Sequence, residues 1–262
     1  MKGFLNLGNT CYFNSCLQCL FQTPSISNGF LLKPYKGDCE FTEEYSKLLK
    51  LFWFEKKTPV LDPQRLLEIF RKKFKQFDNR NEHDAHEAML SVIDILEKAR
   101  PSIKNTLYGT IKKKVIYPGG SSVTHERFSV LMLTPTANSS LEQLLQNHFK
   151  QEVLEGYTDD SGKTHHVTVL EQGIQKYPPI LAIGFNMFHR KFKIKIPEKF
   201  NNYRLYASCV HMGSTRGGHY VAYTKHRNIW YLKDDDNVTK DVRHPREAPF
   251  YLCLFKSINS SN

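Results

Sequence analysis

The stretch GFLNLGNTCYFNSCLQCLFQTP, residues 3–24, places one cysteine between a turn and an apolar helix. From Cys11 to Phe21 apolar residues recur at a helical spacing. Gly8-Asn9-Thr10 favours a tight turn and a helix cap immediately before that run. The thiol of Cys11 is therefore predicted at the positive end of a helix, where a thiol pKa falls. The alternative is a small buried core residue, which is what most cysteines are.

The rest of the chain divides into a helical part and a strand-rich part. Further helices are predicted to start at Asp62-Pro63, with positions 66, 67, 70, 74 and 77 buried, and over residues 84–98. After about residue 107, strands are predicted over residues 110–117, 126–133, 166–170, 180–185, 203–211, 219–224, 229–232 and 251–256, with one helix over 140–149. Paired turn residues stand at Gly119-Gly120, Ser161-Gly162 and Gly217-Gly218. A helical lobe followed by a mostly antiparallel sheet indicates an α+β fold.

Composition narrows the class of protein. The 262 residues carry a formal charge of +11, but the lysines and arginines are scattered and no RNA-binding or zinc-finger signature accompanies them. A solvated basic surface is therefore favoured over a nucleic-acid partner. No apolar run approaches the length of a membrane span, and the residues after Met1 lack the apolar core of a signal peptide. We expect an intracellular protein, in the cytoplasm, the nucleus or both, with six reduced cysteines.

A second motif supplies what a cysteine nucleophile needs, namely a base and a group that orients the base. In GGHYVAY (217–223), His219 leads an alternating strand, and WYLKDDDNV (230–238) follows with three aspartates. Two strands joined by a turn at 225–228 would bring Asp234 back beside His219. The alternative is a plain β-hairpin with an acidic turn.

Together these stretches resemble the ubiquitin-specific proteases, a family of papain-like cysteine deubiquitinases. Residues 3–24 resemble the family's cysteine box, and YRLYASCVHMGSTRGGHYVAY (203–223) with residues 230–238 resembles its histidine box. EHDAHEAMLSVIDIL (82–96) and the closing PFYLCLFK (249–256) follow in family order. The resemblance implies a papain-like α+β fold in a single domain over 1–256, with a flexible tail at 257–262. Within it we expect a helical thumb over about 1–106, short β fingers over about 107–170 and an antiparallel-sheet palm over about 171–256.

The resemblance also implies the catalytic roles. Cys11 is the nucleophile, His219 the base, and Asp234 the third member that orients the histidine. Asp235 is the adjacent acidic residue that supports them. Asn6 aligns with the asparagine whose amide stabilises the oxyanion, a donor whose loss typically costs ~3 kcal/mol of barrier.

A slot for the flexible C-terminal tail of ubiquitin needs acidic groups for its arginines and close walls around its glycines. Asp84 aligns with the family's tail-binding aspartate, and this role is favoured over the plainer interpretation of a charge at a helix N-terminus. Glu82 stands where the family usually has glutamine. The other residues implied on the substrate side are His83, Gly217, Gly218 and Tyr220.

The sequence departs from the family at the fingertips, where many members bind zinc through two Cys-x-x-Cys pairs. The corresponding stretches, residues 111–125 and 157–169, contain no cysteine, so a four-cysteine zinc site is excluded there. Cys16-x-x-Cys19 lies on the first predicted helix, and two core cysteines are favoured over half a metal site or a redox motif. We expect no metal and no cofactor.

The resulting expectation is a monomeric thiol protease that hydrolyses the bond after the C-terminal glycine of ubiquitin on conjugated proteins. Two alternatives stay open. One is a catalytically inactive ubiquitin-binding protein of the same fold. The other is a protease of another ubiquitin-like modifier, which the shortened fingers allow.

Overall fold

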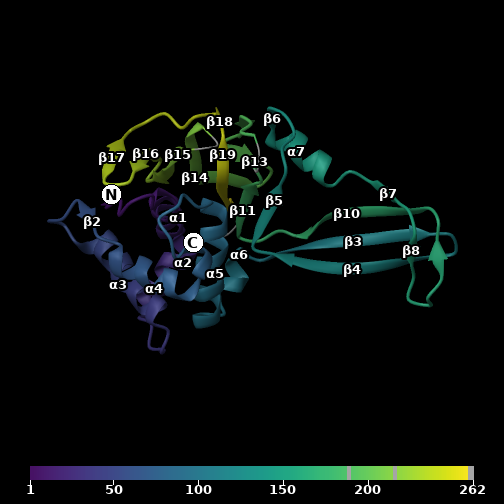
Figure 1. Ribbon diagram of the computed structural model, residues 1–262, viewed down its shortest axis with the longest axis horizontal. Helices are drawn as coiled ribbons and strands as arrows, with labels where there is room; N and C mark the ends of the chain where they lie inside the picture. The colour runs from purple at the N-terminus through teal and green to yellow at the C-terminus, as the bar shows by residue number, and fades with distance from the viewer. Residues whose placement is uncertain (188–189, 215–216, 259–262) are drawn as a thin grey trace.

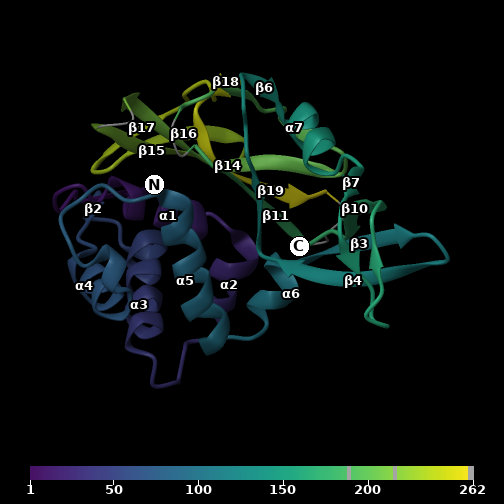
Figure 2. The same cartoon turned by 45° about the vertical axis from the view of Figure 1, so that its right-hand side comes forward.

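The computed structural model describes residues 1–187, 190–214 and 217–258. A helical lobe packs against a large sheet, and a narrow sheet projects from their junction (Figures 1 and 2). The lobe contains α1 (Cys11–Phe21), α2 (Pro24–Leu32), α3 (Glu40–Phe54), α4 (Gln64–Lys73), a 3-10 turn at Lys75–Phe77, α5 (Ala85–Ala99) and α6 (Ile103–Leu107). The α+β class expected from the sequence is confirmed.

Helix α1 is the central element of the molecule. It spans the predicted Cys11–Phe21, and all its residues are buried, because it lies between the sheet and the other helices. The polar residues on this helix are therefore buried as well, and each needs a partner. The prediction of helix 84–98 is also confirmed by α5, with Asp84 as its N-cap.

Three α-helices of the lobe, α2, α3 and α6, were missing from the sequence-based prediction. Pro24 lies just past the end of α1 and occupies the first turn of α2, where its missing N–H costs nothing. Helix α3 buries Phe41, Tyr45, Leu49 and Phe52, a regular helical stripe. That stripe is visible in the sequence, so α3 was predictable.

The large sheet forms the wall opposite the helices. Its strand order is β17 (Asn237–Lys240), β16 (Ile229–Asp234), β15 (Gly217–His226), β14 (Tyr203–Ser214), β19 (Phe250–Ser257), β11 (Ile180–Phe185) and β5 (Val130–Leu133). Only the β11–β5 pair among these is parallel. The sheet is apolar on the helix side: β11 is buried along its whole length.

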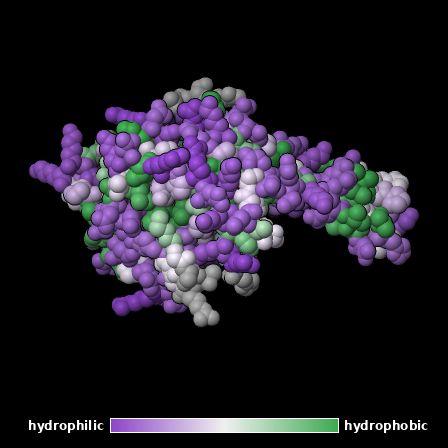
Figure 3. All heavy atoms as spheres, turned by 90° about the horizontal axis from the view of Figure 1, so that it is seen from above, coloured by the Kyte–Doolittle hydropathy of each residue, from purple (hydrophilic) through white to green (hydrophobic). Residues whose placement is uncertain are grey.

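The projecting sheet has the order β4 (Gly120–Phe128), β3 (Gly109–Tyr117), β10 (Thr168–Lys176) and β7 (Glu152–Leu154). The predicted turn at Gly119-Gly120 joins β3 to β4, and Gly119 has a φ of 92°. The expected finger range, 107–170, includes β5 and α7 (Leu141–His148), and β5 belongs to the large sheet. The finger strand β10 in turn continues to Lys176. Figure 3 shows apolar residues at the far end of the projection, where Val153 and Val167 are exposed.

Polar and aromatic contacts stabilise the fingertip, in the stretches where many members of the family have zinc-binding cysteines. A small hairpin, β8 (Tyr157–Thr158) and β9 (Thr164–His165), crosses it. His165 Nε2 lies 2.7 Å from an Asp159 oxygen, and its ring stacks on Tyr117 with centroids 4.4 Å apart. The other oxygen of Asp159 accepts N–H bonds from Ser161 and Lys163. One carboxylate thus ties the loop together.

The remaining short strands are β1 (Gly3–Phe4), β2 (Val60–Leu61), β6 (Ser139–Ser140), β12 (Ile194–Lys195), β13 (Lys199–Phe200) and β18 (Glu247–Ala248). Of the expected flexible tail, Ser257 is the last residue of β19 and Ile258 donates its N–H to the Asn202 carbonyl, while 259–262 lie outside the described residues. Among the described residues, no helix is long and apolar enough to span a membrane.

Candidate active site

Cys11 is the first residue of α1 and is almost fully buried. The turn before it has the predicted form, because Gly8 and Asn9 both have positive φ values, 91° and 51°. Thr10 is the N-cap, but its hydroxyl accepts the Leu7 N–H instead of capping the helix.

The pKa of the Cys11 thiol differs from the expected one. Burial raises this pKa above its ordinary value, and that effect outweighs the lowering by the backbone N–H groups of Tyr220 and Tyr12. The negative charges of Asp235 and Glu82 raise it further. The expectation of a lowered pKa considered only the helix end and a histidine, and it omitted desolvation.

His219 and Asp234 meet as the hairpin prediction requires. Strands β15 and β16 are antiparallel, with Ala222 opposite Lys233 and a turn at Arg227-Asn228. His219 Nε2 lies 2.5 Å from Asp234 Oδ1. The imidazole therefore donates from Nε2, and Nδ1 is left for another partner.

The cysteine and the histidine are neighbours through the backbone. The N–H of Tyr220, the residue after His219, points at the Cys11 sulfur. Within the described residues no hydrogen bond joins that sulfur to the His219 ring, so the pair is adjacent but not engaged. The structure thus brings together Cys11, His219 and Asp234, the residues predicted to act as nucleophile, base and acid.

Asp235 accepts three hydrogen bonds from residues of the N-terminal segment. Its Oδ2 accepts from Asn6 Nδ2 at 2.6 Å and its Oδ1 from Asn14 Nδ2 at 2.8 Å. Its backbone oxygen accepts the Phe4 N–H at 2.8 Å. Burial raises the pKa of this carboxyl, whereas the Asn14 and Asn6 hydrogen bonds lower it.

Asp235 also lies near the histidine. Its Oδ2 is 3.7 Å from His219 Nε2, so Asp234 and Asp235 both face the same ring nitrogen. The ligand atoms of these three residues lie within 4.8 Å of one another, a grouping that could also hold a metal ion. Asp234 makes the shorter contact with the His219 ring. Asp235 stabilises the loop that carries Asp234 through its own hydrogen bonds.

Asn14 belongs to this site but was not singled out in the sequence. It lies three residues after Cys11, buried on the same helix face, and also donates to the Leu5 carbonyl at 3.1 Å. The signal available was a polar residue within an apolar helical stripe. Its partner is 221 positions away along the chain, so the residue's role follows only from the fold.

Asn6 is exposed, but its side-chain oxygen bonds backbone N–H groups of the turn that precedes α1. Its Oδ1 accepts the N–H groups of Gly8 at 3.0 Å and Thr10 at 3.3 Å. One N–H of its amide goes to Asp235. Because a side-chain amide has two N–H groups, a second donor remains at the mouth of the site.

An acidic pocket of about 280 Å³ opens beside the cysteine. It lies between the start of α5 and the sheet, and Glu82, Asp84 and Glu87 supply three carboxylates on its α5 side. The described residues that line it are Glu82, His83, Asp84, Glu87, Met187, Lys191, His211, Tyr220 and Tyr251. The predicted substrate-side residues other than the two glycines are among them.

The two glycines lie at the start of β15, where the sequence predicted a turn. The N–H of Gly218 donates to both carboxylate oxygens of Glu82, at 3.2 Å each. A Cβ on Gly218 would come within 2.2 Å of the His211 ring, whereas none of the described atoms lies within 4 Å of one on Gly217. The packing of the sheet therefore requires glycine at position 218. The Glu82 side chain, from the helical lobe, links that lobe to the sheet through its bonds to Gly218.

The remaining predicted residues have defined contacts in the free chain. Asp84 caps α5 by accepting the His86 N–H at 2.9 Å, as the plainer interpretation proposed. His83 packs its ring against Tyr12 and Phe77. Tyr220 is buried, and its ring meets His211 edge to face with centroids 4.5 Å apart.

The chain is similar to known proteins in both sequence and structure. The family model described as "Ubiquitin carboxyl-terminal hydrolase" matches residues 2–253. Ubiquitin carboxyl-terminal hydrolase Usp2 of Drosophila melanogaster is 26% identical over 327 residues, covering 97% of this chain and 34% of that protein. Ubiquitin carboxyl-terminal hydrolase 16 of Arabidopsis thaliana is 28% identical over 304 residues, covering 97% and 30%. The chain thus spans about a third of the length of these two relatives.

The fold is shared with a solved structure, the SAGA Ubp8/Sgf11/Sus1/Sgf73 DUB module bound to ubiquitin aldehyde. The TM-score is 0.82 at 18% identity, over 98% of this chain and 69% of the solved one. A second structure of that module, bound to monoubiquitin, gives 0.84 at 19% identity.

Proposed function

Because the chain belongs to the ubiquitin carboxyl-terminal hydrolase family, we propose that it is a thiol-dependent deubiquitinase. It hydrolyses the peptide or isopeptide bond after the C-terminal glycine of ubiquitin on conjugated proteins. Residues 1–256 act as one catalytic domain that works as a monomer without a cofactor. Its substrates are intracellular conjugates, so it acts in the cytoplasm, the nucleus or both.

The observation that carries the proposal is the 2.5 Å contact of His219 with Asp234, next to a cysteine at the first position of α1. Asp234 holds the imidazole with Nε2 protonated, so Nδ1 is free to accept the thiol proton. The sulfur attacks the carbonyl carbon of the terminal glycine, and the thiol proton passes to His219. The histidine then gives that proton to the leaving amine, and water hydrolyses the thioester.

The oxyanion formed in that attack needs hydrogen-bond donors. The backbone N–H of Cys11, at the start of α1, and the second amide N–H of Asn6 are the donors we assign. Asp235 acts as a positioning residue, since it anchors Asn6 and Asn14 and keeps the loop that carries Asp234 against β1. No step requires a metal.

The acidic pocket is the proposed slot for the ubiquitin tail. Glu82 and Asp84 attract the tail arginines, while Tyr220 and His83 line the walls. In the free chain Glu82 bonds Gly218 across this slot, so binding of the tail must displace that contact. Burial keeps Cys11 protonated until substrate arrives, because its pKa is raised.

One observation favours a second candidate, an inactive ubiquitin-binding protein: within the described residues the Cys11 sulfur makes no hydrogen bond to His219. Fluorogenic ubiquitin C-terminal amide distinguishes the two. We expect turnover by the wild type, none detectable for Cys11→Ala with ubiquitin binding retained, and a larger loss for His219→Ala than for Asp234→Asn. Equal turnover by Cys11→Ala and the wild type would refute the mechanism. No turnover by the wild type, with ubiquitin bound, would select the binding protein.

A further inference from the structure

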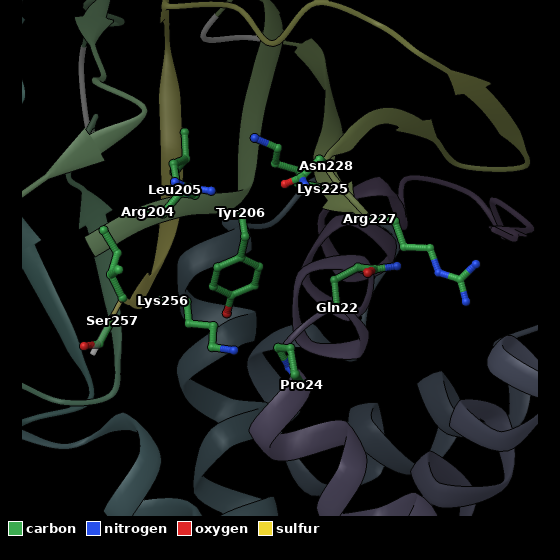
Figure 4. Close-up of a pocket in the computed structure, with 11 residues that line it drawn as sticks. Gln22, Pro24, Arg204, Leu205, Tyr206, Lys225, Arg227, Asn228, Lys256 and Ser257 are labelled. Carbon is green, nitrogen blue, oxygen red and sulfur yellow. The ribbon is translucent and has the colours of Figure 1, made fainter. Parts of the chain in front are cut away.

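A second cavity, of about 710 Å³, lies where the ends of β14, β15 and β19 meet the junction of α1 and α2 (Figure 4). Four of the described lining residues are cations, Arg204, Lys225, Arg227 and Lys256, and none of the described ones is acidic. The remaining lining residues are Gln22, Pro24, Leu205, Tyr206, Asn228, Ser257 and Ile258. The cavity is remote from Cys11: Lys225 lies six residues beyond His219 on the same strand, about 20 Å away.

The register of the sheet gathers these charges on one face. Arg204 of β14 lies directly opposite Lys256 of β19, and on its other side opposite Lys199 of β13. Residues directly opposite in a sheet project to the same face, and like charges in such pairs destabilise it. Three cations in a row across three strands therefore add to the positive potential on this face, which favours a bound anion.

The carboxylate of Glu198, near the cavity, already forms two ion pairs. Glu198 bonds Lys225 at 2.9 Å and Arg246 at 3.0 Å, and these two cations hold its pKa at about 2. Across the described residues no carboxylate forms an ion pair with Arg204 or Arg227. The positive charge at the cavity is thus only partly compensated.

The N-terminus of helix α2, at the cavity wall, adds to the positive potential of the cavity. Pro24 is the first residue of α2, whose N-cap Thr23 makes no side-chain capping bond. Its hydroxyl bonds the Cys19 carbonyl and the Tyr206 hydroxyl instead. The positive end of the α2 dipole therefore lies at the cavity wall without a side-chain cap, an arrangement that favours anions.

We propose that this cavity binds an organic polyphosphate, a small molecule carrying several phosphate groups. Two guanidinium groups match phosphate oxygens in pairs, and the volume exceeds what one phosphate fills. In Figure 4 the Tyr206 ring stands at the centre and Lys256 extends beneath it toward Pro24. Tyr206 is buried and its hydroxyl is engaged, so no exposed ring is available on which a nucleic-acid base could stack. The site is independent of the proposed catalytic function.

Isothermal titration of the full chain with inositol hexakisphosphate at about 50 mM salt tests the site. We expect one molecule bound per chain and an affinity loss of about tenfold or more in Arg204→Gln/Arg227→Gln. Both side chains are exposed, so the variant should keep its fold, and its melting temperature without ligand checks this. Lys72→Gln/Lys73→Gln on α4 removes the same charge from an exposed face elsewhere and should bind as the wild type does.

Vesicles containing phosphatidylinositol bisphosphate distinguish the sources of the phosphates. Retention that the Arg204/Arg227 variant loses assigns a lipid headgroup, and soluble binding without retention assigns a free polyphosphate. Absence of binding at low salt would overturn the proposal. So would an equal loss in the Lys72/Lys73 control, or tighter binding of a single-stranded RNA that the Arg204/Arg227 variant abolishes.

Discussion

Lys233 is a buried lysine that precedes the proposed catalytic Asp234 in the sequence. Its replacement by methionine tests whether burial lowers the pKa of this lysine and so makes the stability of the protein depend on pH. The residue is 1% exposed, and burial lowers its pKa from 10.5 to about 7. Its ammonium donates to the Lys2 carbonyl at 3.1 Å and lies 5.6 Å from the ring centroids of Phe52 and Tyr231. Gln18 donates to the same carbonyl at 2.9 Å, so methionine leaves no acceptor without a partner.

The sign of the pH dependence follows from the lowered pKa. Between about pH 7 and 10.5 the unfolded chain binds a proton at this amine that the folded chain does not, so stability rises with pH at about 1.4 kcal/mol per unit. Below pH 7 both states are protonated and the slope vanishes. From pH 7.5 to 9.0 the expected gain is about 2 kcal/mol for the wild type, and Lys233→Met should lack this contribution.

Urea unfolding followed by tryptophan fluorescence at both pH values measures the difference. Thiols and tyrosines titrate in the two proteins alike, so their contributions cancel when the variant is compared with the wild type. We expect Lys233→Met to be the more stable protein at pH 7.5, with the advantage shrinking by about 2 kcal/mol at pH 9.0. An advantage that is the same at both pH values would refute the argument, because the amine would then titrate normally.

Three further predictions concern the nucleophile, the slot and the fingertip. Alkylation of Cys11 by iodoacetamide in the free chain should keep accelerating above pH 9, since the thiol pKa is raised; a plateau below pH 8 would indicate an ion pair with histidine. Glu82→Gln removes a charge that attracts the tail arginines, so this variant should react more slowly with a ubiquitin probe; faster reaction would show that the Glu82 contact with Gly218 hinders the tail more than the carboxylate helps it. His165→Ala removes the bond to Asp159 and should raise KM for ubiquitin substrates several-fold with kcat unchanged, whereas an unchanged KM would show that the fingertip makes no contact.

The features of this structure that depend on residues close together in the chain could be predicted from the sequence. The bounds of α1, the cap of α5 and the hairpin that brings Asp234 to His219 followed from spacing and turn chemistry, because each depends on neighbours in the chain. The helix predicted over 140–149 is present as α7, and Ser140 at its start forms a capping box with Gln143. Helix α3 was missed although its stripe was present.

The long-range part could not be predicted. Burial of Lys233 and Asn14 depends on elements more than two hundred residues apart. The raised thiol pKa of Cys11 depends on how deeply α1 is enclosed. The close approach of the His211 ring to Gly218, which leaves no room for a side chain there, likewise depends on the fold. Periodicity identifies a buried face but not the atoms that cover it.

The most direct measurement is the intact mass of the purified chain after incubation with ubiquitin bearing a C-terminal thiol-reactive group. The account predicts a single covalent adduct that Cys11→Ala abolishes and that probes built on other ubiquitin-like modifiers do not form. An adduct only with another modifier would keep the chemistry and move the substrate. No adduct, or one that persists in Cys11→Ala, would contradict the assignment of Cys11 as the nucleophile of a deubiquitinase.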